Sequence, residues 1–191
     1  MSIQHRKSPD TGMRRVIGGF TLMEVLVTIV ILSVGLLGVA GLQLNSLRGN
    51  QNALEASVAT NLAMEGADRI RANLPGIRNP DTGIANRTYY DLIDAAGTDP
   101  GCITTTAGCS VAQIAQTDAY EWITRIQQLL PGGQGVICRD GTPNDGTSAA
   151  APACDGATGP NGEDIFAIKI WWDHDRDPST PLLGYRMSLI P

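Results

Sequence analysis

The sequence has few charged residues, and it has no cluster of basic residues after its first 19 positions. Charged side chains make up 17% of the 191 residues, and after residue 19 eighteen acidic residues outnumber ten basic ones. Binding to a nucleic-acid backbone depends on clustered Lys and Arg, which release the counterions of the phosphates. The composition therefore argues against a nucleic-acid partner.

The usual motifs of catalysis are also missing. The chain has no Gly-x-Ser-x-Gly motif and no phosphate-binding loop, and His174 is its one histidine after residue 19. Nucleophilic catalysis needs a nucleophile and a base that can be brought within hydrogen-bond reach of each other. We therefore predict a structural protein that is not an enzyme and uses no cofactor.

Charge is absent altogether from the 23 positions 25–47, which are mostly Val, Leu, Ile, Gly and Ala. A helix needs about 20 apolar residues to cross the core of a bilayer. Four basic residues precede this run, so the positive-inside rule keeps the N-terminus in the cytoplasm and sends the rest of the chain outward. These residues are Arg6, Lys7, Arg14 and Arg15. We expect a single membrane span followed by an external head.

An ordinary secretory signal is the alternative interpretation of this apolar run. The apolar region of such a signal is typically shorter, at about 7–15 residues. Small residues at Val39-Ala40-Gly41 form a weak cleavage site for it. In that case the mature chain would be a soluble periplasmic binding protein.

Glu24 places a single carboxylate at the start of the apolar run. A charge at the bilayer centre costs roughly 2.5–3.5 kcal/mol on insertion scales, and less near the interface, so such charges usually have a partner. Cleavage after Gly19 would supply one, because Phe20 would then carry a positive α-amine four residues from the carboxylate. In a stack of helices, the amine of a neighbouring subunit can take that place. The alternative is a carboxylate in the headgroup region without any partner.

The segment Arg14-Arg15-Val16-Ile17-Gly18-Gly19-Phe20-Thr21-Leu22-Met23-Glu24 resembles the class III signal of type IV prepilins and type II secretion pseudopilins. In that family a prepilin peptidase cuts after the glycine, on the cytoplasmic side, and methylates the new amine. The resemblance implies that Gly19 ends the leader, that Phe20 is the N-methylated first mature residue, and that Glu24 is the assembly glutamate. It also implies that the protein stays in the inner membrane, with a periplasmic head, until it enters a pilus or a periplasmic filament.

Two features of this N-terminal region are less typical. The leader begins at Met1 or at Met13, and the sequence leaves both starts open. Major pilins commonly carry a proline midway along the apolar helix, where this chain has Gly35, Gly38 and Gly41 instead. Small residues of this kind let neighbouring helices approach closely in membranes.

The helical pattern continues beyond the apolar run and ends before Pro75-Gly76. Apolar residues or glycine recur every four positions in a stripe formed by Leu54, Val58, Leu62, Gly66, Ile70 and Leu74. We predict one helix from Phe20 to Asn73, about 80 Å long at 1.5 Å per residue. The domain organisation is then a leader at 1–19, a transmembrane half-helix at 20–47, an amphipathic half at 48–74 and a head at 75–191.

The head is predicted to contain a second helix and a small sheet. Asp118-Ala119-Tyr120-Glu121 resembles a capping box and predicts a helix from Asp118 to Leu130. Residues Asn79–Thr88 are interpreted as a loop. Alternating apolar patterns predict strands at Gly135–Cys138, Asp164–Trp172 and Leu183–Ile190, the last two as a hairpin. The expected fold class is α+β, with a long N-terminal helical spine packed against an antiparallel sheet.

The four cysteines all lie in the head, which fits an oxidising periplasm. We favour the sequential pairs Cys102–Cys109 and Cys138–Cys154 among the three possible connectivities, because each pair closes a short loop with few apolar residues. Free thiols or a metal site are the alternatives. Neither spacing matches a pair of zinc ligands, so we expect no metal.

Two polar segments leave their roles open. The loop from Arg139 to Glu163 has no large apolar side chain, and we interpret it as solvated and held by a disulfide rather than as a contact surface. The alternating carboxylates Asp173, Asp175 and Asp177 resemble the opening of a calcium loop. However, the glycine and the distal glutamate of an EF-hand are missing. We favour an ordinary turn between strands.

The head resembles minor pilins of the kind represented by the pilus modification protein PilV. This resemblance depends on Asp118-Ala119-Tyr120-Glu121-Trp122 and on Leu130-Pro131-Gly132-Gly133-Gln134-Gly135-Val136. It implies a minor pilin that helps to initiate or cap a type IV pilus. The implied partners are other minor pilins, the major pilin, the prepilin peptidase and the assembly machinery. A minor pseudopilin of a type II secretion system is the alternative, because it would share the same N-terminus.

Overall fold

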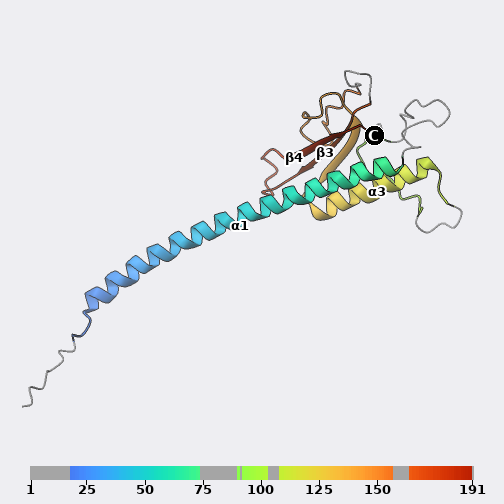
Figure 1. Cartoon of the computed structure of the whole chain (residues 1–191). Helices are drawn as coiled ribbons and strands as arrows, with labels where there is room; N and C mark the ends of the chain where they lie inside the picture. The colour runs from blue at the N-terminus through green and yellow to red at the C-terminus, as the bar shows by residue number, and fades with distance from the viewer. Residues whose placement is uncertain (1–17, 74–89, 91, 103–107, 157–163, 191) are drawn as a thin grey trace, which may run out of the picture. The chain divides into compact units, whose positions relative to one another are not determined.

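Figure 1 shows the structure, a computed structural model that describes residues 18–73, 90, 92–102, 108–156 and 164–190. The chain divides into two compact units, which meet in sequence between Leu47 and Arg48. The elements are α1 (Leu22–Ala72), β1 (Leu92–Ile93), α3 (Val111–Leu129), β2 (Gln134–Arg139), β3 (Phe166–Trp172) and β4 (Leu183–Leu189). The predicted α+β fold is confirmed. The loop expected at Asn79–Thr88 lies outside the described residues.

Helix α1 confirms the predicted N-terminal helix, and both of its ends lie within two residues of the expected positions. The part of α1 in the first unit, which ends at Leu47, is apolar on every side. Its most apolar stretch of 18 residues has a mean hydropathy of 2.7, and none of that stretch is buried. In length and composition this part of α1 is able to cross a membrane. It is exposed all round because no other described element of its unit packs on it.

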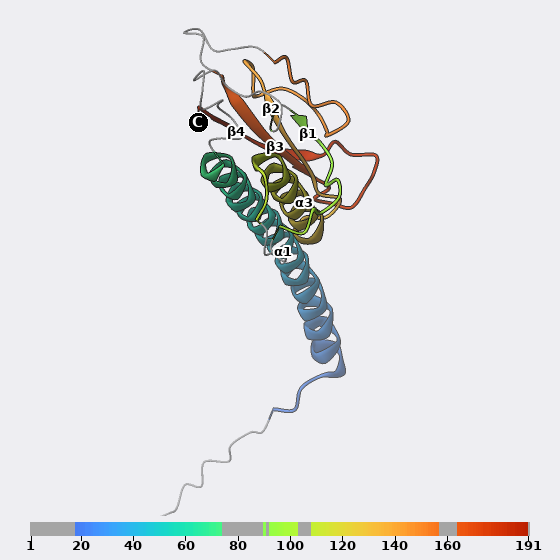
Figure 2. The same ribbon diagram turned by 90° about the vertical axis from the view of Figure 1, so that its right-hand side faces the viewer.

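The second unit is built on a four-stranded antiparallel sheet of order β1-β2-β3-β4. The predicted hairpin is confirmed, since Phe166 pairs with Leu189 and Trp172 with Leu183. The part of α1 after Leu47 and helix α3 lie side by side on one face of this sheet (Figure 2). The main hydrophobic core forms there, and on β3 it takes the side chains of Phe166, Ile168, Ile170 and Trp172.

The buried side of α1 differs from the predicted stripe at its start. Leu54 is 66% exposed, so its inclusion in the stripe was wrong, whereas Leu62, Gly66 and Ile70 are buried as expected. Residues spaced four apart drift slowly around a helix that has 3.6 residues per turn. The buried side of α1 keeps facing the core because it also includes alanines at spacings of three and four. The alanines that complete the buried side are Ala59, Ala63 and Ala67.

Helix α3 begins seven residues before the predicted start at Asp118. Its N-cap is Ser110, whose side chain accepts a hydrogen bond from the backbone of Gln113 while the Gln113 side chain accepts one from the backbone of Ser110. This is a complete capping box, which satisfies two backbone N–H groups that a helix start leaves without partners. The predicted start at Asp118 was therefore wrong, whereas the predicted end at Leu130 lies within one residue of the observed end. The Asp118 carboxylate lies inside the helix and forms an ion pair with Arg69 of α1.

The other face of the sheet is covered by the loop that follows β2. All seven residues of β3 are buried, including Ala167, Lys169 and Trp171, whose side chains point away from the helices. Ala149 and Cys154 of the loop pack against this second apolar cluster. The described part of this loop, up to position 156, is held by the Cys138–Cys154 disulfide as predicted, and every residue from 141 to 156 keeps some exposure. The prediction did not include its packing against this face of the sheet.

Candidate processing and assembly site

The chain changes from irregular backbone to helix just after the predicted cleavage position. Residues 18–21 have no regular structure, and α1 begins at Leu22. The backbone N–H of Glu24 donates to the Thr21 hydroxyl (3.2 Å) and lies near the Thr21 carbonyl oxygen (3.1 Å). A threonine that accepts from the N–H three residues later is an N-cap. Thr21 therefore starts the helix and leaves the Gly19–Phe20 bond outside it.

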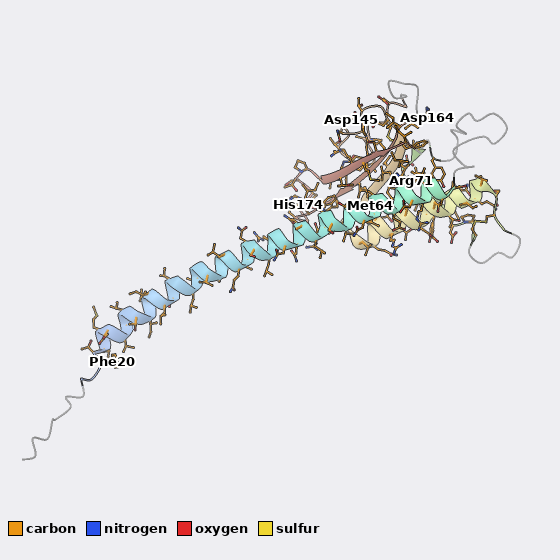
Figure 3. All side chains as sticks on the ribbon, in the orientation of Figure 1. Phe20, Met64, Arg71, Asp145, Asp164 and His174 are labelled. Carbon is orange, nitrogen blue, oxygen red and sulfur yellow. A yellow bond between two sulfur atoms is a disulfide. The ribbon has the colours of Figure 1, made fainter. Side chains whose placement is uncertain are left out.

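The backbone around the predicted cleavage position is open. A Cβ atom added to Gly18 or to Gly19 would meet no atom within 4 Å, and Phe20 is 83% exposed. Figure 3 shows Phe20 where the described chain enters the helix. Exposed, non-helical chain with small residues is the kind of segment that proteases cut most readily. The geometry suits cleavage between Gly19 and Phe20.

Glu24 lies in the first turn of α1, where it completes the Thr-x-x-Glu pattern begun by Thr21. A carboxylate at this end of a helix interacts favourably with the helix dipole. Its side chain is exposed, and no ion pair in the described part of the chain includes it. The carboxylate is therefore open to a positive group from another molecule.

The surface around Glu24 is apolar. The exposed fractions of the neighbouring side chains are 84% for Leu22, 68% for Met23 and 52% for Leu26. In water such a continuous apolar surface would be unfavourable, so it calls for a membrane or for neighbouring helices as its surroundings. In either setting, a single carboxylate in an apolar helix can select the one alignment of a neighbouring helix that brings a positive charge next to it.

The cysteines form the two sequential disulfides. Cys102 is bonded to Cys109, and Cys138 to Cys154, with Cα–Cα distances of 5.7 and 6.1 Å. The second bond ties the end of β2 to the loop that covers the outer face of the sheet. The head is thus crosslinked at two separate loops.

Two of the three carboxylates that resemble a calcium loop, Asp175 and Asp177, organise a turn between β3 and β4. Asp175 accepts hydrogen bonds from the Asp177 N–H (3.1 Å) and the Thr180 hydroxyl (2.8 Å), while Asp177 accepts from the N–H and the hydroxyl of Ser179. These hydrogen bonds hold the pKa of both carboxyls below the usual range. Among the described residues, the oxygen atoms of Asp173, Asp175 and Asp177 do not lie close enough together to share one metal ion.

Sequence analysis missed an ionic network between α1 and α3. Arg69 forms ion pairs with Glu65 (2.9 Å), Asp118 (3.1 Å) and Glu121 (2.8 Å). Burial acts to lower the pKa of Arg69, but the hydrogen bonds that its guanidinium donates to the three carboxylates together raise it. The spacing of Glu65 and Arg69, four residues apart on one helix, was the signal that could have indicated part of this network.

Comparison with known families agrees with this geometry. The model of the family described as Prokaryotic N-terminal methylation motif matches residues 14–40. The model of the Tt1218-like family, described as Type IV pilin Tt1218, matches residues 41–120. No significant match was found among curated proteins or among solved structures. The two family matches do not single out PilV.

Proposed function

Since the chain is a type IV pilin with a class III signal, we propose that it acts as a minor pilin, which helps to initiate or to cap a pilus. The position of Glu24 carries the proposed entry into a filament, and the minor role is inferred from the resemblance of residues 118–122 and 130–136 to minor pilins. Glu24 is a lone exposed carboxylate on an apolar helix, and it lies one helical turn after an open cleavage segment. A helix of this kind fits anchoring in the inner membrane before it enters the pilus.

The proposed sequence of events begins in the membrane. Prepilin peptidase cuts between Gly19 and Phe20 on the cytoplasmic side and methylates the new amine. Because α1 begins with the cap at Thr21, cleavage leaves the helix start intact and adds a positive charge in front of it. The head stays on the periplasmic side, where its two disulfides are stable.

Assembly then transfers the apolar helix from lipid to neighbouring pilin helices. The carboxylate of Glu24 pairs with the N-terminal amine of an adjacent subunit, so that neither charge is left alone in apolar surroundings. Other minor pilins and the major pilin supply these neighbouring helices. The loss of lipid contacts is offset by packing against them, with Gly35, Gly38 and Gly41 permitting close approach.

The test is incorporation of a Glu24→Ala variant into pili, in cells that assemble pili and lack the unmodified chain. We expect normal leader removal, but about tenfold less protein in sheared pili, which corresponds to about 1.4 kcal/mol of lost pairing. Asp68→Ala is the matched control, since Asp68 is a 77% exposed carboxylate in the later part of the same helix. Equal incorporation of all three proteins would contradict the charge-pairing mechanism.

The minor role is tested by stoichiometry in the same preparations. Quantitative mass spectrometry of sheared pili should find this chain far below the major pilin, and removing its gene should reduce the number of pili. A preparation in which this chain is the main subunit would refute the minor role while leaving the pilin assignment in place.

A further inference from the structure

The side chain of Lys169 lies on the outer face of the sheet, in the middle of β3, and is completely buried. Four of its neighbours on that face are the apolar side chains of Val136, Cys138, Ala167 and Trp171, each 0% exposed. The fifth is Arg186, its partner on β4, which donates to the carbonyl oxygens of Asp145 and Gly146. Lys169 is therefore an amine in an apolar layer, which is an unfavourable place for an ammonium ion without compensation.

The main partner of Lys169 is the carboxyl group of Asp140, which follows β2 directly and is also completely buried. Its oxygen Oδ1 accepts a hydrogen bond from the Thr142 N–H (2.9 Å). Its oxygen Oδ2 touches Nζ of Lys169, yet it accepts no hydrogen bond of acceptable geometry from the described residues. The contact thus brings amine and carboxyl together without the alignment of an ordinary hydrogen bond.

A second carboxylate reaches the same amine from the covering loop. Oδ1 of Asp145 lies 2.7 Å from Nζ of Lys169, and the Asp145 side chain is 44% exposed, so it connects the buried amine to solvent. The carbonyl oxygen of Pro152 accepts a further hydrogen bond from Nζ (2.8 Å). In Figure 3, Asp145 lies across the sheet from the segment of α1 that carries Met64 and Arg71, which places this cluster away from the helical core.

We propose that Lys169 and Asp140 join in an intramolecular isopeptide bond. Nζ of Lys169 attacks Cγ of Asp140, an N–C bond forms, and the bond from Cγ to Oδ2 breaks. Two of the three protons of the ammonium leave with Oδ2 as one water molecule, and the third stays on the amide nitrogen. No oxidant, reductant or other reactant is consumed.

Asp145 carries the protons in this reaction. One ammonium proton passes to the Asp140 carboxylate within the ion pair, which leaves a neutral amine beside a carboxylic acid. Asp145 accepts the second proton as Nζ attacks and delivers it to the departing hydroxyl, in the manner of a general base that then acts as a general acid. Lys169 lies on β3, and Asp140 is held at the end of the paired strand β2 by its N–H, which donates to the Ile165 carbonyl oxygen (3.0 Å), so the step gains from fixed proximity. The product also replaces two buried charges with a neutral amide.

The test is mass spectrometry of the full chain, purified in detergent, reduced, alkylated and digested with trypsin. Arg139, Lys169 and Arg176 are successive cleavage sites, so an unlinked chain gives a peptide of residues 140–169. A linked Lys169 resists trypsin, and the expected product is therefore a peptide of residues 140–176 that is one water molecule lighter than its sequence. A full-mass peptide that ends at Lys169 would overturn the proposal.

Two variants distinguish the isopeptide bond from other reactions that remove one water molecule. Succinimide formation at Asp140-Gly141 or Asp145-Gly146 also removes one water, but it leaves cleavage at Lys169 intact and does not require the lysine. In Lys169→Met the loss of water should disappear, and its persistence would overturn the isopeptide bond. In Asp145→Ala the linked fraction should fall at least about tenfold at equal times. An unchanged fraction would overturn the role of Asp145.

Discussion

The two parts of α1 on either side of Leu47 have the same secondary structure but opposite surroundings. Before Leu47 the helix carries apolar side chains on all sides, and its most apolar window is fully exposed. After Leu47 it buries one side, formed by Ala59, Leu62, Ala63, Gly66, Ala67 and Ile70. The second part finds its partners within its own unit, in α3 and the sheet, and the first part has none there.

This difference shows how one helix can serve two kinds of packing. Small residues occur in both parts, but only in the second does another described side chain reach them. A Cβ on Gly66 would lie 3.0 Å from Trp122, whereas a Cβ on Gly38 would meet nothing within 4 Å. Under the proposed function, the first part packs against molecules outside the chain, namely lipid and then neighbouring subunits. Substitutions in the two parts should consequently affect different properties.

The largest difference is expected for a pair of alanine substitutions. Trp122 is fully buried, and its indole N–H donates to the Leu62 carbonyl oxygen (2.7 Å), so Trp122→Ala should lower the free energy of unfolding by about 3–5 kcal/mol. Leu36→Ala, at a 69% exposed position, should change it by less than about 0.5 kcal/mol. Denaturant unfolding of the full chain in detergent can be followed by the remaining tryptophans, which all lie in the second unit. Equal losses of stability would contradict the distinction.

A pair of glycine substitutions sharpens the comparison within the helix. Gly66→Val adds atoms against Trp122 and Ile168, and such overpacking should destabilise the head by about 1–3 kcal/mol. Gly38→Val should leave unfolding of the head unchanged, but it should weaken incorporation into pili if close helix packing matters there. The same unfolding assay, together with the amount of protein in sheared pili, measures both effects. A stable Gly66→Val head would show that α1 can move away from α3.

Two arginines near the end of α1 provide a smaller contrast. Arg69→Met removes the positive charge that Glu65, Asp118 and Glu121 share, and we expect a loss of about 1–2 kcal/mol. Arg71→Met breaks only an exposed pair with Asp68, so its effect should stay below about 0.5 kcal/mol. Thermal unfolding monitored by near-UV circular dichroism would rank the two variants. The reverse order would rule out the proposed importance of the network.

The smallest expected effect concerns alkaline pH. Burial, above all, raises the pKa of Tyr90 above its usual value of 10.0, and its hydroxyl donates to Asp118 (2.8 Å). The folded state therefore holds this proton more tightly than the unfolded state, so the stabilisation is complete below pH 10 and is lost as the pH rises further. Ultraviolet titration should show one tyrosine that ionises late or only on unfolding. Tyr90→Phe should remove that component, and its persistence would assign it to another tyrosine.

Local sequence signals predicted much of the molecule. The apolar run, the register of Gly19, Phe20 and Glu24, and the alternation in β3 and β4 each involve neighbours in sequence, so one segment carries the whole signal. The earlier start of α3 was also encoded locally, because Ser110 and Gln113 have the spacing of a capping box. A similar pattern at Asp118 competes with it in the sequence, and only the structure distinguishes the two.

The outer face of the sheet could not be predicted in the same way. Its covering layer comes from a loop of small and polar residues, and its polar centre joins Lys169 to Asp140 and Asp145, which are distant in sequence. Alternation in a strand indicates two faces, but it does not indicate that a loop without large apolar side chains will bury the second one. The Arg69 network had the same difficulty, since two of its three carboxylates lie on α3.

The most direct test of this account is the mass of the N-terminal peptide of the mature chain. We predict a peptide that begins at N-methylated Phe20. Gly19→Val should block this processing and Gly18→Val should not, although neither added side chain meets another atom in the structure. A mature chain that begins near Leu42 would instead indicate an ordinary secretory signal. It would contradict the conclusion that the first part of α1 persists as an anchor and assembly helix.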